Sequence, residues 1–164
     1  MHHVLPRIRA REPRARLIVI GSDPPPRHSL PEADAIDLVG FVEDVREPLA
    51  RYSVFVCPIL SGSGVRVKLL EAFAAGIPVV STRLGAEGLA STDGDVCALA
   101  DDPDSFAQRV LDLLEDPEKA AGIARRARAE VVAKRDMRGM TEKLVDCYEA
   151  EVRRMRETGM QTGG

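Results

Sequence analysis

Residues 54–82 read VFVCPILSGSGVRVKLLEAFAAGIPVVST. The apolar run 54–58 predicts a buried strand, and the glycine-bearing segment 61–64 predicts a flexible loop. The segment 67–75 predicts a helix that is ended by Gly76 as its C-cap and by Pro78. A second apolar run at 79–82 predicts another strand. Two apolar strands joined through a helix are typical of a parallel sheet, because parallel neighbours need a long crossover connection.

The same alternation of short apolar strands and helices extends along the rest of the chain. Asp44 and Asp102 are good N-caps for two of the helices, and Pro103 suits a first helical position. The pattern predicts an α/β fold: a Rossmann-like, doubly wound parallel sheet with helices on both faces. Further strands are expected at 17–20, 36–40 and 96–99, and further helices from Val4, over 42–52, and after 102, 116 and 136.

We expect one nucleotide-binding domain over residues 1–158 and a disordered tail over 159–164. Domains of this class start with a strand, whereas a helix-like stretch follows Met1 almost directly. The first strand is therefore expected to be missing. The apolar stripe of the last helix is expected to pack in the core or against a missing domain; it consists of Met137, Met140, Leu144, Tyr148, Val152 and Met155.

Composition excludes several classes of function. The chain has 164 residues, 45% of them apolar, which fits one domain with a sizeable core. A net charge of -3 argues against a nucleic-acid partner. No apolar run approaches the roughly 18 residues of a membrane span, and no signal peptide is visible, so a cytoplasmic location is expected. The cysteines at 57, 97 and 147 lie far apart and predict free thiols, with no metal site.

The junction between the glycine loop and the following helix predicts an anion site. The first backbone N–H groups of a helix have no partner within it and lie at the positive end of its dipole. Arg66 and Lys68 stand in or near the first turn, where cations are unfavourable for the helix by a few tenths to about 1 kcal/mol. Their position is explained if they share an anion such as phosphate with the helix end.

Glu71 is the second chemical signal. Its sequence neighbours are apolar, so we expect a buried carboxylate that needs a partner. It stands about one turn past the helix start, roughly 5–7 Å along the axis, where a nucleotide bound through its phosphates would place its ribose. Adjacent ribose hydroxyls can donate to the two oxygens of one carboxylate. The alternative is a simple Lys68–Glu71 pair at i, i+3 spacing.

Three segments, VGFVEDV at 39–45, SVFVCP at 53–58 and KLLEAFAAGIPVVST at 68–82, resemble the C-terminal domain of the family 4 (group 1) retaining glycosyltransferases. The resemblance covers residues 17–118. It implies a GT-B architecture, in which two Rossmann-like domains enclose the active site between them. The domain seen here would hold the nucleoside diphosphate sugar, and the N-terminal domain would hold the acceptor. The family needs no metal or other cofactor.

The resemblance also implies roles for individual residues. The family motif has two glutamates eight positions apart; Glu71 matches the second, which holds the ribose hydroxyls, and Ser63 stands where the first contacts the donor sugar. A related subset has a Gly-Ser-Gly loop followed by Arg and Lys, as here, and a later Gly-Ala-Glu-Gly-Leu, here residues 85–89. The implied donor-binding set is Glu71, Ser63, Gly64, Val65, Arg66, Lys68, Gly21, Phe41 and Val42, with backbone amides near Ser63, Gly64 and Val65 on the distal phosphate and backbone near Phe41 and Val42 on the base.

The family also places an Arg and a Lys on the diphosphate from the loop after the domain's first strand. Those cations and the acceptor domain are expected to be missing, so we predict that this chain alone binds donor weakly and transfers no sugar. The whole protein is expected to transfer a hexose and to associate peripherally with the inner face of the membrane through the other domain. The catalytic residue is not identified. Two alternatives stay open: half of a nucleotide-sugar epimerase, or a stand-alone nucleotide-binding or interaction module.

Overall fold

The structure is a computed structural model that describes all residues except 2, 31–32, 50, 65, 136 and 162–164. Val65, one of the predicted site residues, therefore lies outside the described residues. The chain divides into two compact units, Met1–Arg128 and Ala129–Gly164.

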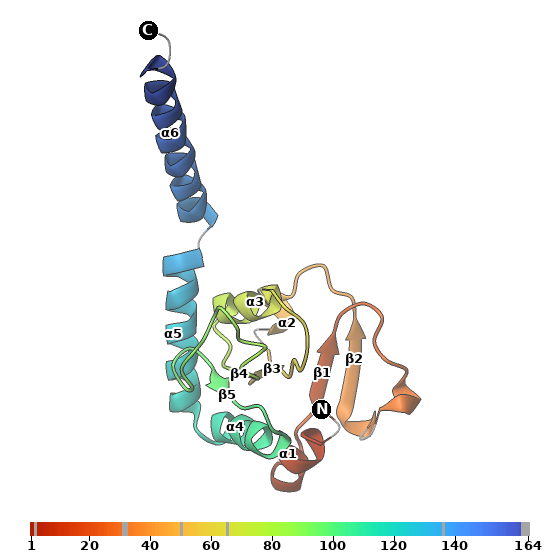
Figure 1. The fold of residues 1–164 in the computed structure, drawn as a ribbon. Coiled ribbons are helices and arrows are strands. Elements are labelled where there is room, and N and C mark those ends of the chain that lie inside the picture. Colours follow the sequence, from red (N-terminus) through yellow and green to blue (C-terminus); the bar gives the residue numbers. More distant parts are fainter. Residues whose placement is uncertain (2, 31–32, 50, 65, 136, 162–164) are drawn as a thin grey trace. The chain divides into compact units, whose positions relative to one another are not determined.

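The first unit confirms the predicted alternation of strands and helices (Figure 1). Asp102 is the N-cap of α4, as expected, and its side chain accepts hydrogen bonds from the backbone N–H groups of Asp104 and Ser105. Gly76 ends α3 in the left-handed conformation, at φ 72°. The elements are α1 (Leu5–Arg11), β1 (Leu17–Ile20), two 3-10 turns (Arg27–Ser29 and Ala33–Ala35), β2 (Ile36–Gly40), α2 (Arg46–Leu49), β3 (Phe55–Cys57), α3 (Val67–Ala75), β4 (Val79–Ser81), β5 (Ala98–Leu99), α4 (Pro103–Glu115) and α5 (Pro117–Arg135).

Four elements are shorter than predicted: β3 and β4, by one or two residues at their ends, and more markedly β5 and α2. β5 begins only at Ala98, because the carbonyl of Cys97 closes a turn by accepting from Gly94 N–H at 2.9 Å. α2 ends at Leu49, and the chain continues in i→i+3 turns in which Arg51 N–H donates to Pro48 O and Tyr52 N–H to Leu49 O. Hydrophobic spacing alone does not separate such turns from a helix.

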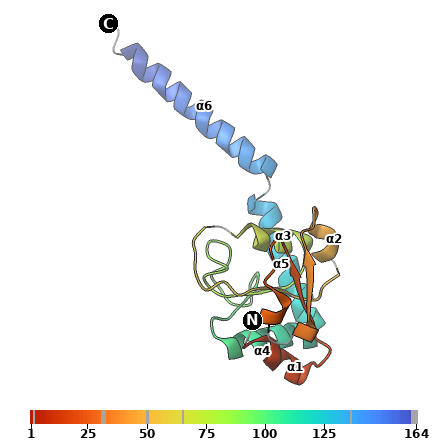
Figure 2. The same cartoon turned by 90° about the vertical axis from the view of Figure 1, so that its right-hand side faces the viewer.

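All strand pairs among the described residues are parallel, and they form two sheets. β1 pairs with β2, with Leu17 opposite Ile36. β3, β4 and β5 form the second sheet, in that order, with Phe55 opposite Val79 and Val80 opposite Ala98. α3 lies on one side of this second sheet and α4 on the other, and both contact β4 (Figures 1 and 2). The expected layers of helix, parallel sheet and helix are present.

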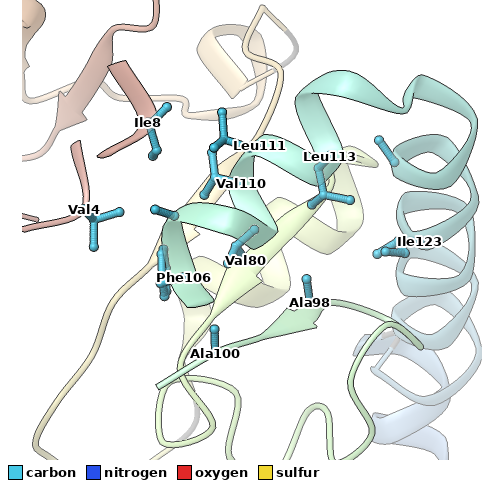
Figure 3. Packing of buried hydrophobic residues seen from close by; sticks show 12 residues of the cluster. Val4, Ile8, Val80, Ala98, Ala100, Phe106, Val110, Leu111, Leu113 and Ile123 are labelled. Carbon is cyan, nitrogen blue, oxygen red and sulfur yellow. The ribbon is translucent and has the colours of Figure 1, made fainter. Parts of the chain in front are cut away.

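β4 is the centre of the core. Its residues Val79, Val80 and Ser81 are fully buried, as expected for a strand covered on both faces. Figure 3 shows the cluster on the α4 side, where Val80 meets side chains from α1, α4, β5 and α5. Its labelled members are Val4, Ile8, Val80, Ala98, Ala100, Phe106, Val110, Leu111, Leu113 and Ile123. This packing fixes the position of the loops that follow β3 and β4.

α6 (Met137–Gln161) forms most of the second unit. Its helical residues include 159–161 of the predicted tail, while 162–164 lie outside the described residues. The four members of its predicted apolar stripe whose side chains are described, Leu144, Tyr148, Val152 and Met155, are 45–67% exposed. The side chains of the two methionines at 137 and 140 lie outside the described ones. No helix within the described residues is long and apolar enough to cross a membrane.

Candidate functional site

The loop from Pro58 to Gly64 leads from β3 to the amino end of α3. Gly62 and Gly64 adopt φ values of 106° and 93°, which side-chain-bearing residues rarely reach. Residues 61–64 are exposed to solvent. The N-cap position of α3 is Arg66, whose side chain makes no capping hydrogen bond, and the first turn holds no acidic residue. The free N–H groups of this turn therefore keep their capacity to bind an anion.

The guanidinium of Arg66 folds back against this loop. Nη1 donates to the carbonyl oxygen of Ser63 at 3.1 Å. Nε and Nη2 are buried and have no hydrogen-bond partner in the described structure. Gly62 lies against the same group, since a Cβ added to it would stand 3.5 Å from Nη2. A buried cationic donor without an acceptor is costly, so this arrangement favours the arrival of an anion.

Lys68 stands in the first turn of α3 and Glu71 one turn further along, and both are exposed. The expected burial of Glu71 is wrong. Neither residue forms an ion pair or hydrogen bond with any described residue, so the predicted alternative of a Lys68–Glu71 pair is not formed either. The Glu71 carboxylate is thus open to an external donor, one turn along the helix from the glycine loop.

The other predicted residues lie at the carboxyl ends of β1 and β2. Gly21 N–H donates to Gly40 O at 2.8 Å, which ties the two strand ends together. Phe41 follows directly and is 76% exposed, while Val42 is half-buried. The structure thus brings Ser63, Gly64 and Arg66 into one cluster. It leaves Gly21, Phe41 and Val42 on the neighbouring sheet, and no described hydrogen bond joins the two groups.

A hydroxyl network between the carboxyl ends of β3 and β4 was not predicted from the sequence. Thr82 Oγ1 donates to Ile59 O at 2.6 Å and accepts from Gly85 N–H at 3.0 Å. Ser81 Oγ has two carbonyl acceptors within reach, Thr82 O at 2.9 Å and Cys57 O at 3.3 Å. These bonds connect the segment after β3 to the segment after β4. In the sequence, the signal for this network was a pair of hydroxyl residues, Ser81 and Thr82, at the end of a buried strand and shortly before Gly85.

Gly85 is required by this network. A Cβ at this position would lie 2.5 Å from Ser81 Oγ and 3.0 Å from both Cys57 O and Thr82 Oγ1. Contacts below 3.0 Å force the surroundings to move, so any larger residue would displace the Ser81 hydroxyl or the backbone at position 85.

The two buried cysteines are not suited to nucleophilic chemistry. Burial raises the pKa of the Cys57 thiol, although the Ser81 hydroxyl and the charges of Arg66 and Lys68 act to lower it. Burial also raises the pKa of Cys97, to about 12. Both thiols are therefore protonated near neutral pH, and the thiolate is the reactive form.

The loop after β4 contributes fewer candidate ligand-binding side chains than the glycine loop. Arg83 is paired with Asp101 at 3.4 Å, and its backbone N–H donates to the same carboxylate. Glu87 is exposed. Within the described ranges, no group of three or more His, Cys, Asp or Glu side chains is placed to hold a metal ion. The site as described can bind an anion at the start of α3 and hydroxyl groups at Glu71.

Comparison with known proteins gives consistent matches. Residues 1–116 match the family described as Glycosyl transferases group 1. A phosphatidyl-myo-inositol mannosyltransferase of Mycolicibacterium smegmatis is 31% identical over 152 residues, which cover 88% of this chain and 39% of that protein. HepE of Anabaena in complex with UDP shares the fold with a TM-score of 0.78 at 18% identity, covering 92% of this chain and 45% of that chain.

A third similar protein is the C-terminal domain of LpcC, a glycosyl transferase group 1 family protein from Francisella tularensis. It matches with a TM-score of 0.67 at 20% identity, covering 82% of this chain and 79% of that chain. The present chain therefore spans about two fifths of the length of the mannosyltransferase it matches, but most of the length of this separate C-terminal domain.

Proposed function

The chain belongs to the group 1 glycosyl transferases, and from this premise we propose that it is the donor-binding domain of a retaining, family 4 glycosyltransferase. The whole protein moves a hexose from a nucleoside diphosphate sugar to an acceptor hydroxyl. The chain holds the nucleotide sugar at the carboxyl ends of its parallel strands, the usual ligand side of such sheets. A second domain holds the acceptor.

One observation carries this proposal: the buried, unpartnered Nε and Nη2 atoms of Arg66 at the amino end of α3. A guanidinium offers five N–H donors, of which Nη1 uses one on Ser63 O. A diphosphate supplies charged oxygens for the remaining donors, and such charge-assisted bonds are about twice as strong as neutral ones. The free amides of the first turn of α3 and the exposed Lys68 add to the same site.

The same residues stabilise the leaving group. When the bond from the anomeric carbon to the phosphate oxygen breaks, negative charge grows on the diphosphate. Donors already fixed at that position lower the barrier, because they do not have to reorganise during the step. Arg66 is fixed in this sense, since its side chain is held between Gly62 and Ser63.

Glu71 is proposed to accept hydrogen bonds from the two ribose hydroxyls. Its carboxylate is exposed, it has no partner among the described residues, and it follows the phosphate-binding turn by one turn of helix. Ser63 and Gly64 approach the distal phosphate and the donor sugar through the exposed loop. The base lies toward Gly21, Phe41 and Val42, where Phe41 offers an open aromatic face.

The acceptor and the cellular location are proposed from the family membership and from the relative named above. The Mycolicibacterium smegmatis relative is named a phosphatidyl-myo-inositol mannosyltransferase, which favours a lipid-linked acceptor here as well. Such an acceptor is reached by a cytoplasmic enzyme that rests on the inner face of the membrane through its other domain. Because that domain contributes half of the active site, the present chain alone binds donor weakly and transfers no sugar.

The proposal is tested by calorimetric titration of the purified chain with UDP, GDP and ADP and with their glucose and mannose conjugates. We expect one base to be preferred, with a Kd of about 0.1–1 mM, equivalent to about 4–5.5 kcal/mol. Sugar release and transfer to a hydroxyl acceptor are followed in parallel and are expected to be absent. Equal binding of all three nucleotides, or no binding at about 10 mM, contradicts the donor-binding role. Transfer by the chain alone contradicts the need for a second domain.

A further inference from the structure

Two acidic residues stand in the segments that follow β3 and β4. In residues 58–71, which run from the end of β3 into α3, the sole acidic residue is Glu71, and in residues 82–92, which follow β4, it is Glu87. β3 and β4 are parallel neighbours, so both segments start at the same edge of the sheet, where such sheets bind their ligands. Glu71 is proposed above to contact the ribose, whereas Glu87 has no role in the donor site so far.

The turn that carries Glu87 is held against the end of β3. Gly85 N–H donates to Thr82 Oγ1 at 3.0 Å, and Ala86 N–H donates to Thr82 O at 3.0 Å. Gly85 packs so closely that a Cβ added to it would stand 3.0 Å from Cys57 O, at the end of β3. The backbone before Glu87 therefore has a fixed position beside the segment that leads into the glycine loop.

The turn has an inner and an outer side. Gly85 and Ala86 are buried on the inner side, while Glu87 and Gly88 are exposed on the outer side. Residues 61–64 of the glycine loop are exposed as well. Because neighbouring strands lie about 4.8 Å apart, the two loops start within one strand spacing of each other. A sugar attached to a diphosphate at the glycine loop can therefore reach the outer side of this turn.

The carboxylate of Glu87 is not engaged within the protein. It forms no ion pair or hydrogen bond with any residue that the structure describes. The cation four positions earlier in the turn is Arg83, but its side chain pairs with Asp101 at 3.4 Å. The backbone N–H of Arg83 donates to the same Asp101 carboxylate at 2.8 Å, which holds this residue away from a local pair with Glu87.

The chemistry of a free carboxylate restricts which part of a nucleotide sugar it can bind. An ionised carboxylate only accepts hydrogen bonds, so its ligand has to offer donors. The diphosphate offers none and is repelled, whereas a hexose carries several hydroxyl groups. Hydrogen bonds from hydroxyls to a carboxylate are charge-assisted, and they are about twice as strong as bonds between neutral groups. A site that binds a substrate hydroxyl in this way also discriminates strongly against a sugar that lacks it.

We propose that Glu87 is a specificity-determining residue that contacts the transferred sugar. Its carboxylate accepts hydrogen bonds from hydroxyl groups of the hexose and so determines which donor sugar the domain accepts. Glu71 and Glu87 then share the recognition of the donor, with the ribose at Glu71 and the hexose at Glu87. This role rests on the proposed function, because the hexose reaches the turn only when the diphosphate lies at the start of α3.

The test compares a nucleoside diphosphate with its hexose conjugate, for the base that the unaltered chain prefers. Titration of the purified chain followed by NMR measures dissociation constants up to about 10 mM. We expect the hexose to improve the affinity of the unaltered chain by about tenfold. Glu87→Ala should remove this gain, while its affinity for the nucleoside diphosphate stays within about twofold of the unaltered value.

Conjugates that lack one hexose hydroxyl at a time identify the group that Glu87 binds. Loss of that hydroxyl should weaken binding to the unaltered chain by about tenfold and binding to Glu87→Ala by less than about twofold. Glu149→Ala, on the exposed surface of α6, is the charge-matched control and should keep the full gain from the hexose. Glu87→Ala should also keep its Tm within about 2 °C, because Glu87 is exposed.

The possible outcomes separate the role of Glu87 from the donor-binding function. If the nucleoside diphosphate binds and Glu87→Ala discriminates between hexose conjugates as the unaltered chain does, the role of Glu87 alone is wrong. The same holds if the hexose adds no affinity to the unaltered chain. If the unaltered chain binds no nucleoside diphosphate at all, the donor-binding function is wrong and the role of Glu87 fails with it.

Discussion

Arg66 Nη1 donates a hydrogen bond to Ser63 O at 3.1 Å, while Nε and Nη2 of the same guanidinium are buried without partners. The side chain is therefore positioned by the loop but not neutralised by it. Among the described residues, no carboxylate approaches this cation. A group in this state lowers the stability of the free chain and gains its missing bonds from an anion. Removing the Arg66 guanidinium should consequently lower nucleotide affinity without lowering the stability of the free chain.

Replacing Arg66 by Met removes the two unsatisfied donors and keeps a side chain of similar length. We expect nucleotide affinity to fall by about 10- to 100-fold, the equivalent of losing about 1.5–3 kcal/mol of charge-assisted hydrogen bonding. We expect the free energy of unfolding to stay within about 0.5 kcal/mol or to rise, since the desolvation of the guanidinium no longer opposes folding. Calorimetry and urea denaturation measure the two quantities on the same preparation.

The matched control for Arg66→Met is Arg125→Met, because Arg125 is exposed on α5 and has the same charge. It should change neither affinity nor stability by more than about 0.5 kcal/mol. A loss of stability in Arg66→Met that equals or exceeds its loss of affinity would indicate that Arg66 serves the fold and not the ligand.

Glu71 is expected to recognise the ribose. Glu71→Ala should weaken binding of the preferred nucleoside diphosphate by about tenfold, because two hydroxyl-to-carboxylate bonds are lost. The 2′,3′-dideoxy form of that nucleotide should bind the two proteins equally, since it has no hydroxyls to lose. The unfolding free energy should not change, because Glu71 is exposed and unpaired in the described structure.

Glu149→Ala on the exposed surface of α6 serves as the charge-matched control for Glu71→Ala and should bind like the unaltered chain. If Glu71→Ala weakens the ribo- and dideoxynucleotides to the same extent, its carboxylate acts through general electrostatics and the assignment to the ribose is wrong.

The order of strands and helices was predictable, because helix limits such as the end of α3 at Gly76 and the start of α4 at Asp102 depend on local signals. The burial of Glu71 was mispredicted because its neighbours in sequence were used as neighbours in space. On a helix, the residues that share its face are three and four positions away. Two of these, Val67 and Lys68, are exposed, which is consistent with an exposed Glu71.

Other features of the site depend on contacts between segments far apart in the chain. Thr82 reaches Ile59 O, and Gly85 fits against Ser81 and Cys57, only after β3 and β4 have paired. The burial of the Arg66 guanidinium likewise depends on the path of the glycine loop. The spacing of residues along the sequence does not determine these distances. The contacts of Thr82 and Gly85 could therefore not be predicted from it.

Two glycine substitutions should have opposite effects on stability. Gly85→Ala places a Cβ 2.5 Å from Ser81 Oγ and should lower the unfolding free energy by about 1–3 kcal/mol, as overpacking of a core does. Gly122→Ala is the control in the interior of α5, where the nearest contact is the flexible end of Arg126 at 3.4 Å. It should raise the unfolding free energy by up to about 1 kcal/mol. Urea denaturation of both variants tests the pair, and a neutral Gly85→Ala would contradict the tight packing of Gly85 against Ser81 and Cys57.

Cys97 should make the chain less stable at alkaline pH. Burial raises its pKa from 9.0 to about 12, so above pH 9 the unfolded chain loses the thiol proton while the folded chain keeps it. The unfolded state then binds fewer protons, and the free energy of unfolding falls as pH rises from about 9 to 12, by at most about 1.4 kcal/mol per pH unit. Cys97→Ala removes this contribution, so its stability should decline less steeply than that of the unaltered chain between pH 8.5 and about 11.

Cys147→Ala, which removes an exposed thiol, is the control and should keep the steeper decline. Parallel curves for Cys97→Ala and the unaltered chain would mean that the Cys97 thiol is accessible to solvent in the folded state.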